Sequence, residues 1–161
     1  MDDRDSSALP AFSEAEQRHF MALALAESRH ALPACLPNPP VGCVIVCGGV
    51  VVARGFTGAP GTPHAEAAAL LALANGQDAD TLALFVTLEP CAFVGRTPSC
   101  AQAIVASGIR RVFVGTLDPD LRNDGAGIDI MRRAGIAVRV GVLEMIVRDF
   151  IKPYLLTGPG A

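Results

Sequence analysis

The sequence is short of the residues that several classes of protein depend on. It has no tryptophan, one tyrosine and a single lysine, Lys152, and aromatic residues make up only 5% of its 161 positions. It contains no run of Lys and Arg and carries a net charge of -3, so it lacks the basic surface typical of nucleic-acid binding. Scarce aromatic residues also argue against a stacking surface for single strands. We therefore expect no nucleic-acid partner.

Long apolar runs and targeting signals are missing as well. The longest apolar stretches, such as AAALLALA, are far too short to span a bilayer. The opening residues, MDDRDSSALP, are acidic and polar and have neither the basic nor the apolar region of a signal peptide. The five cysteines are an odd number, which favours free thiols or metal ligands over a disulfide framework. We expect a cytoplasmic protein without a membrane partner.

What is present is the composition of one globular domain. Hydrophobic residues make up 51% and charged residues 18%, and the length suits a single core. We expect a flexible tail over residues 1–12 and one domain over residues 13–161. The mean hydropathy of +0.40 is high for a small monomer, which favours a homodimer or a higher homo-oligomer.

The apolar pattern predicts alternating helices and strands. Ser13 and Glu16 form a capping-box pattern at the start of the first helix, and a later helix has Thr97 at its predicted cap. The predicted elements are helix 14–30, strands 41–47 and 50–56, helix 64–75, strand 81–88, helix 97–108, strand 110–116, helix 128–135, strand 136–143 and helix 144–156. This order is typical of a three-layer α/β/α sandwich built on a mixed sheet of five strands.

Two stretches of the sequence carry chemistry. HAEAAAL begins at His64 and places Glu66 two residues later, and PCAFVGRTPSC places Cys91 and Cys100 around a loop. These residues are either scattered or form a metal site with an acid beside it. All three candidate ligands fall at strand ends or helix starts, where loops gather on one side of an open α/β sheet. One imidazole and two thiolates predict a tetrahedral Zn²⁺ site that keeps a fourth position for water, as catalytic sites do.

Glu66 fits this site only under one geometric condition. Residues two apart on a helix diverge by roughly 200°, so Glu66 cannot stack beside His64 on a regular helix face. We expect His64 to sit at the helix cap, with Glu66 pointing into the same cleft as a proton shuttle and not as a ligand. Glu89, by contrast, is expected to bond the backbone of a loop.

The motifs resemble a known family. H-x-E followed by P-C…C is the signature of zinc-dependent nucleobase deaminases. PNPPVGCVIV, PHAEAAAL and VTLEPCAFVGRTPSC are similar to the deaminase domains of bacterial riboflavin-biosynthesis proteins, over about residues 16–158. The resemblance implies a cytidine-deaminase-like fold, a zinc ion held by His64, Cys91 and Cys100, and proton transfer by Glu66.

The resemblance also implies how substrate is recognised. Asn38 matches a residue that touches the pyrimidine, and Arg96 matches a basic residue that approaches the substrate's phosphate. Phe93 and Thr57 stand where the family usually has histidines associated with substrate recognition, so we assign both to the substrate-binding set. The reductase half of those proteins has no counterpart in this sequence.

Four functions follow from these features. The first is the riboflavin-pathway pyrimidine deaminase, which acts on diaminohydroxyphosphoribosylaminopyrimidine. The second is a deaminase of another small amino-heterocycle, such as a pterin, purine, pyrimidine or triazine base, which Phe93 favours by offering an apolar contact. A nucleic-acid editing deaminase is disfavoured by the acidic charge balance. A zinc-binding subunit without catalysis is disfavoured by Glu66, which a scaffold would not need.

Overall fold

The computed structural model describes residues 11–94 and 98–155, and its elements follow the predicted order. The α-helices are α1 (Glu14–Arg29), α2 (Ala65–Ala72), α3 (Cys100–Ser107), α4 (Ala126–Arg133) and α5 (Glu144–Leu155). The strands are β1 (Gly42–Cys47), β2 (Val50–Phe56), β3 (Leu82–Leu88), β4 (Arg111–Thr116) and β5 (Ala137–Val140), and a short 3₁₀ helix, η2 (Ala79–Thr81), precedes β3.

The five strands form one mixed sheet in the order β2-β1-β3-β4-β5. Strand β1 pairs antiparallel with both β2 and β3, whereas β3, β4 and β5 run parallel. All seven residues of β3 are buried because the strand lies at the centre of the sheet with helices on both faces. The carboxyl ends of β3 and β4 therefore open at the same edge, and their loops lie close together.

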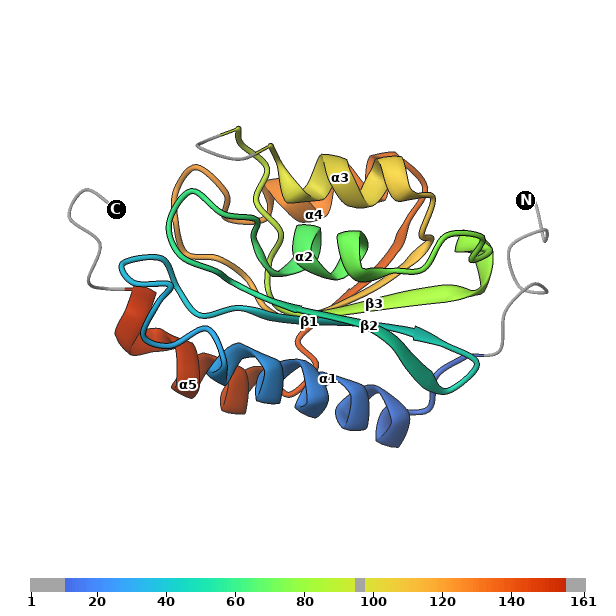
Figure 1. Ribbon diagram of the computed structural model, residues 1–161, viewed down its shortest axis with the longest axis horizontal. Helices are drawn as coiled ribbons and strands as arrows, with labels where there is room; N and C mark the ends of the chain where they lie inside the picture. Colours follow the sequence, from blue (N-terminus) through green and yellow to red (C-terminus); the bar gives the residue numbers. More distant parts are fainter. Residues whose placement is uncertain (1–10, 95–97, 156–161) are drawn as a thin grey trace.

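Helices cover both faces of the sheet, which confirms the predicted three-layer sandwich. Figure 1 places α2, α3 and α4 on one face and α1 with α5 on the other. On the α1 face the core is aromatic, and the rings of Phe85 and Phe113 stack with centroids 4.5 Å apart. On the opposite face the core is aliphatic and includes Ile104 and Met131.

The predicted helix start at Ser13 is confirmed. Its hydroxyl accepts the backbone N–H of Glu16, whose carboxylate accepts the N–H of Ser13. Phe12, which the sequence assigned to the tail, packs edge-on against Phe85 and Phe113. Residues 1–10, the rest of the predicted tail, lie outside the described residues.

Several predicted ends were wrong, and α4, expected over 128–135, spans Ala126–Arg133. Helix α2 was expected to reach Asn75, but it ends at Ala72 because Leu73 turns to an extended conformation ahead of the turn at Gly76. Strand β5 was expected to reach Leu143, but it stops at Val140, since Gly141 and Leu143 both adopt positive φ. Within residues 11–94 and 98–155, no helix combines the length and apolarity that crossing a membrane would need.

Candidate active site

His64 is the cap residue of α2, as its spacing from Glu66 required. Its backbone is extended, with φ −69° and ψ 170°, and its side chain does not cap the helix. The helix lies tightly against β2, because a Cβ on Gly55 would meet the Ala65 carbonyl oxygen at 2.3 Å. This close packing holds the start of α2 against the sheet and so sets the backbone position of His64, from which the imidazole extends.

The two cysteines are brought together by backbone bonds at the start of α3. Cys100 is the first residue of the helix, and its N–H donates to the Cys91 Sγ at 3.2 Å. The N–H of Ala101 and the hydroxyl of Ser99 donate to the Cys91 carbonyl, at 3.1 and 2.8 Å. The chain around Cys91 is therefore held against the helix N-terminus.

The N-cap of α3 is Ser99 and not Thr97. The Ser99 hydroxyl accepts the Gln102 N–H at 3.3 Å while it donates to the Cys91 carbonyl. A hydroxyl at this position can therefore both cap the helix and tie down the loop. Thr97 itself lies outside the described residues.

His64, Cys91 and Cys100 form a group that can hold a metal ion. The His64 Nδ1 atom lies 3.5 Å from the Cys100 Sγ and 3.9 Å from the Cys91 Sγ, and the three ligand atoms all fall within 4.8 Å of one another. One nitrogen and two sulfurs suit a tetrahedral zinc ion with one position left for a non-protein ligand. The donor set therefore fits zinc.

Burial and mutual contact shift the pKa values of this group. Hydrogen bonds from Cys100, opposed by burial, lower the pKa of Cys91 to about 4. The pKa of Cys100 is raised by its hydrogen bond to the Cys91 thiolate and by burial. A bound cation would favour ionisation of both thiols.

Glu66 lies beside this group and is buried, with 4% of its surface exposed. Burial raises the pKa of the Glu66 carboxyl to about 7, the Cys91 thiolate adds to the rise, and His64 and a Cys100 hydrogen bond oppose it. A carboxyl group with this pKa can accept and release protons near neutral pH, which is the property that general acid–base catalysis uses.

Glu89 bonds a loop backbone, as predicted, and the structure identifies which loop. The residue is buried, and its carboxylate accepts the N–H groups of Asp118, Gly125 and Gly127 at 3.0 to 3.1 Å. The Asn123 side-chain amide donates to the Pro90 carbonyl at 3.3 Å. The segment between β4 and α4 is thus fastened to the chain just before Cys91.

Sequence reasoning missed Arg122, which lies in that same segment. Its guanidinium carbon lies 4.2 Å from the centroid of the Phe93 ring, and the group also bonds the Asp120 carboxylate. Nothing in the sequence linked Phe93 with Arg122, because they belong to different loops. The pattern of acidic and basic residues in DPDLRND was the only available signal.

The remaining predicted substrate residues are not gathered around the metal group by any described contact. The Thr57 hydroxyl accepts the Val41 N–H at 3.0 Å and is buried, so it joins the ends of β1 and β2. Asn38 is half-buried, and its N–H donates to the Cys35 carbonyl at 2.9 Å. Arg96 lies outside the described residues. The substrate-binding roles of these residues stay predictions.

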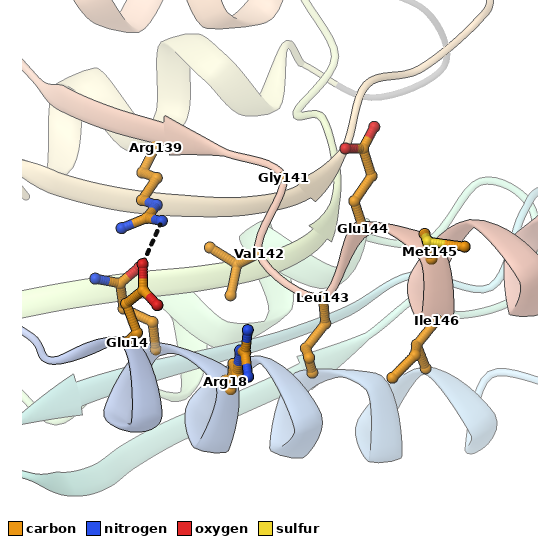
Figure 2. Close-up of a pocket in the computed structure, with 10 residues that line it drawn as sticks. Glu14, Arg18, Arg139, Gly141, Val142, Leu143, Glu144, Met145 and Ile146 are labelled. Atoms are coloured by element: carbon orange, nitrogen blue, oxygen red, sulfur yellow. Dashed lines mark ion pairs between the residues drawn. The ribbon is translucent and has the colours of Figure 1, made fainter.

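A hollow of about 510 Å³ lies elsewhere, between the start of α1 and the turn from β5 into α5. Figure 2 shows Arg139 reaching across it to Glu14, with which it forms an ion pair at 3.6 Å. Its described lining includes Leu143 and Met145 and none of the metal-binding group. We therefore place the candidate site at the His64 group and not at this hollow.

Comparison with known proteins agrees with this placement. The family model described as the cytidine and deoxycytidylate deaminase zinc-binding region matches residues 14–116. The riboflavin biosynthesis protein RibD of Aquifex aeolicus is 45% identical over 82% of this chain and 36% of its own length. A chloroplastic riboflavin biosynthesis protein PYRD of Zea mays is 40% identical over 92% of this chain and 38% of its own length.

Solved structures give the same family. The diaminohydroxyphosphoribosylaminopyrimidine deaminase/5-amino-6-(5-phosphoribosylamino)uracil reductase of Thermotoga maritima matches with a TM-score of 0.82 and 38% identity, over 88% of this chain and 41% of that one. The RibD of Acinetobacter baumannii matches with a TM-score of 0.82 and 36% identity, over 89% of this chain and 40% of that one.

The chain spans a little over a third of the length of the curated relatives it matches. The family match falls on α1 through β4, the part of the fold that contains His64, Glu66, Cys91 and Cys100. On the family model, the relatives and the fold, this chain belongs to the cytidine and deoxycytidylate deaminase family.

Proposed function

We propose that this protein is the zinc-dependent deaminase that converts the diaminohydroxyphosphoribosylaminopyrimidine of riboflavin biosynthesis into the corresponding uracil. The observation that carries the proposal is the group of His64, Cys91 and Cys100 with buried Glu66 beside it, inside a chain 36–45% identical to riboflavin biosynthesis proteins. The substrate is taken from the name of the Thermotoga maritima relative, whose reductase activity acts on a uracil.

His64, Cys91 and Cys100 would hold the zinc ion. When bound, zinc acts as a Lewis acid that makes water a nucleophile near neutral pH. The two sulfurs and the imidazole nitrogen are already within 4.8 Å of one another. The backbone bonds to Cys91 and the packing of α2 on β2 support a site that is largely formed before the ion binds.

Glu66 transfers the protons in the proposed reaction. Its carboxylate takes a proton from the attacking water and gives one to a ring nitrogen of the pyrimidine. The water oxygen then bonds to the carbon that bears the amino group. Glu66 then takes the remaining proton from that oxygen and passes it to the amino group, so that a carbon–oxygen double bond forms as the carbon–nitrogen bond breaks and ammonia leaves. Burial raises the pKa of the Glu66 carboxyl, which favours its taking a proton from water.

Substrate recognition in this proposal rests on four further residues. Asn38 would bond the pyrimidine and Arg96 the phosphate, while Phe93 and Thr57 replace the family's usual histidines. We also propose that the protein works in the cytoplasm as a homodimer or higher homo-oligomer. All five of its cysteines are unpaired, which suits a reducing compartment.

The Glu66→Gln variant tests the proposal. It should fold normally, retain zinc and bind the phosphorylated diaminopyrimidine, but release ammonia at least about 10²–10⁴ times more slowly than the wild type. Glu144→Gln is the matched control, because Glu144 is an exposed carboxylate on α5 that pairs with Arg148. Near-normal ammonia release by Glu66→Gln would show that another group moves the protons.

The second candidate is deamination of another small amino-heterocycle, of the pterin, purine, pyrimidine or triazine class. Phe93 and Thr57 in the place of two histidines favour it, since substrate choice depends on such contacts. A panel of these bases, read by ammonia release from the wild type, separates the two candidates. Turnover of an unphosphorylated base with no turnover of the phosphorylated pyrimidine would select the second.

A further inference from the structure

Arg122 is held in one orientation by two different groups. Its Nε atom donates to the Asp120 carboxylate at 3.1 Å and its Nη2 atom donates to the other oxygen at 2.6 Å, so the pair is bidentate. Phe93 lies against the guanidinium plane, with 4.2 Å between the guanidinium carbon and the ring centroid. The Arg122 side chain makes both contacts although 60% of it is exposed.

This arrangement leaves one edge of the guanidinium unused. Arginine has five N–H donors, and Asp120 occupies the edge made by Nε and Nη2. Among the described residues, no other group accepts a bond from the Arg122 side chain, so none of them occupies the edge made by Nη1 and Nη2. That edge has the spacing that binds a phosphate or carboxylate in a bidentate way.

The position of Arg122 is tied to the metal-binding group. Phe93 follows Cys91 by two residues, which limits the separation of their Cα atoms to about 7 Å. Arg122 is carried by the segment that Glu89 and Asn123 fasten to the backbone just before Cys91. The segment that carries Arg122 is therefore fastened to the chain that leads into Cys91, and the Arg122 side chain contacts Phe93 just after it.

We propose that Arg122 binds the anionic group of the substrate, a phosphate, and that Phe93 and Asp120 are the residues that position it. The inference rests on the proposed function, and it changes the role given to Phe93. The ring supports a cation and does not stack on the heterocycle. The protein thus selects a phosphorylated substrate through a residue that the loop after β4 contributes.

The test compares a phosphorylated aminopyrimidine substrate with the same compound lacking its phosphate. Arg122→Ala should raise KM for the phosphorylated compound about 10- to 100-fold, the loss expected for charge-assisted hydrogen bonds. It should leave kcat, and the KM of the unphosphorylated compound, within about twofold of the wild type. Phe93→Leu keeps an apolar side chain but removes the ring face. It should also raise KM for the phosphorylated compound alone, but by less than Arg122→Ala does.

Arg139→Ala is the matched control, because Arg139 is also ion-paired with a carboxylate and half exposed, but lines the hollow in Figure 2. It should change neither KM. Equal changes in both KM values for Arg122→Ala would mean a structural role and would overturn the inference. So would no change in either, the result expected if Arg96 alone bound the phosphate.

Binding of inorganic phosphate, measured by titration calorimetry on the zinc-loaded protein, separates this inference from the proposed function. The wild type should bind phosphate, and Arg122→Ala should bind it at least about tenfold more weakly. If the wild type turned over neither compound but showed this difference, the proposed function would fail and the anion site would stand. Equal phosphate binding by the two proteins would refute the anion site.

Discussion

Replacing Glu89 with glutamine should destabilise the protein more than it slows the reaction. The buried Glu89 carboxylate accepts four backbone N–H groups, two at each oxygen, from Asp118, Gly125, Gly127 and Ile128. A glutamine keeps one acceptor oxygen and turns an amide donor toward the other pair. Two buried N–H groups then face a donor whichever way the amide lies.

The magnitude follows from those two groups. A buried N–H left without an acceptor costs about 1–3 kcal/mol. Gly127 N–H keeps a partial alternative in the Asn123 side-chain oxygen at 3.2 Å, and the Ile128 bond is long at 3.4 Å. We therefore expect the free energy of unfolding to fall by about 2–4 kcal/mol, while kcat on the natural substrate falls by less than about threefold.

Urea unfolding followed by far-ultraviolet circular dichroism measures this loss, since the chain has no tryptophan to serve as a probe. Wild type and Glu89→Gln are compared at two zinc concentrations. If weaker zinc binding lowered the free energy of unfolding of Glu89→Gln, its difference from the wild type would grow with zinc concentration. If the lost loop bonds lowered it, the difference would stay the same.

Glu144→Gln again serves as the control, because its exposed ion pair with Arg148 should be worth less than about 1 kcal/mol. A loss below about 0.5 kcal/mol for Glu89→Gln would refute the reasoning, because an ordinary surface substitution reaches that value. A drop in kcat as large as that expected for Glu66→Gln would place Glu89 in the chemistry.

Three further predictions concern the metal group and assembly. Elemental analysis should find about one zinc per chain, and the double variant Cys91→Ser with Cys100→Ser should retain none; zinc retained by that variant would contradict the ligand assignment. Ser99→Ala removes both the α3 cap and a bond to the Cys91 carbonyl, so the free energy of unfolding should drop by about 1–2 kcal/mol in urea, and an unchanged midpoint would argue against the cap. Light scattering at micromolar concentration should give a multiple of 16.7 kDa, and the mass of one chain would disprove the oligomer.

The sequence was most informative where the spacing of two residues permits only one arrangement of their side chains. His64 and Glu66 are two residues apart, so they can serve one site only when His64 occupies the helix cap, and the structure has it there. Glu89 directly follows a strand that is buried on both faces and is itself buried, so its carboxylate needs backbone donors, and it has them. The strands and helices could be predicted because the apolar periodicity and the capping box at Ser13 indicated the same elements.

The parts that could not be predicted depend on where loops meet. Thr97 and Ser99 are both plausible caps on either side of Pro98, and only the bond from Ser99 to the Cys91 carbonyl selects between them. The contact of Phe93 with Arg122 joins loops after two different strands. Helix propensity favoured a longer α2, but the extended backbone of Leu73 ends it.

The approach of Gly127 to Pro90 limits which substitutions this protein can accept near the metal-binding group. A Cβ at position 127 would lie 1.9 Å from the Pro90 carbonyl oxygen, so any other residue would push away the backbone just before Cys91. Leu121, in the loop before α4, is 93% exposed, and Arg122 beside it has described contacts only with Asp120 and Phe93. Libraries that randomise Leu121 and Arg122 should yield folded enzymes with new substrate preferences, whereas libraries that also vary Gly127 should be dominated by clones that have lost the fold.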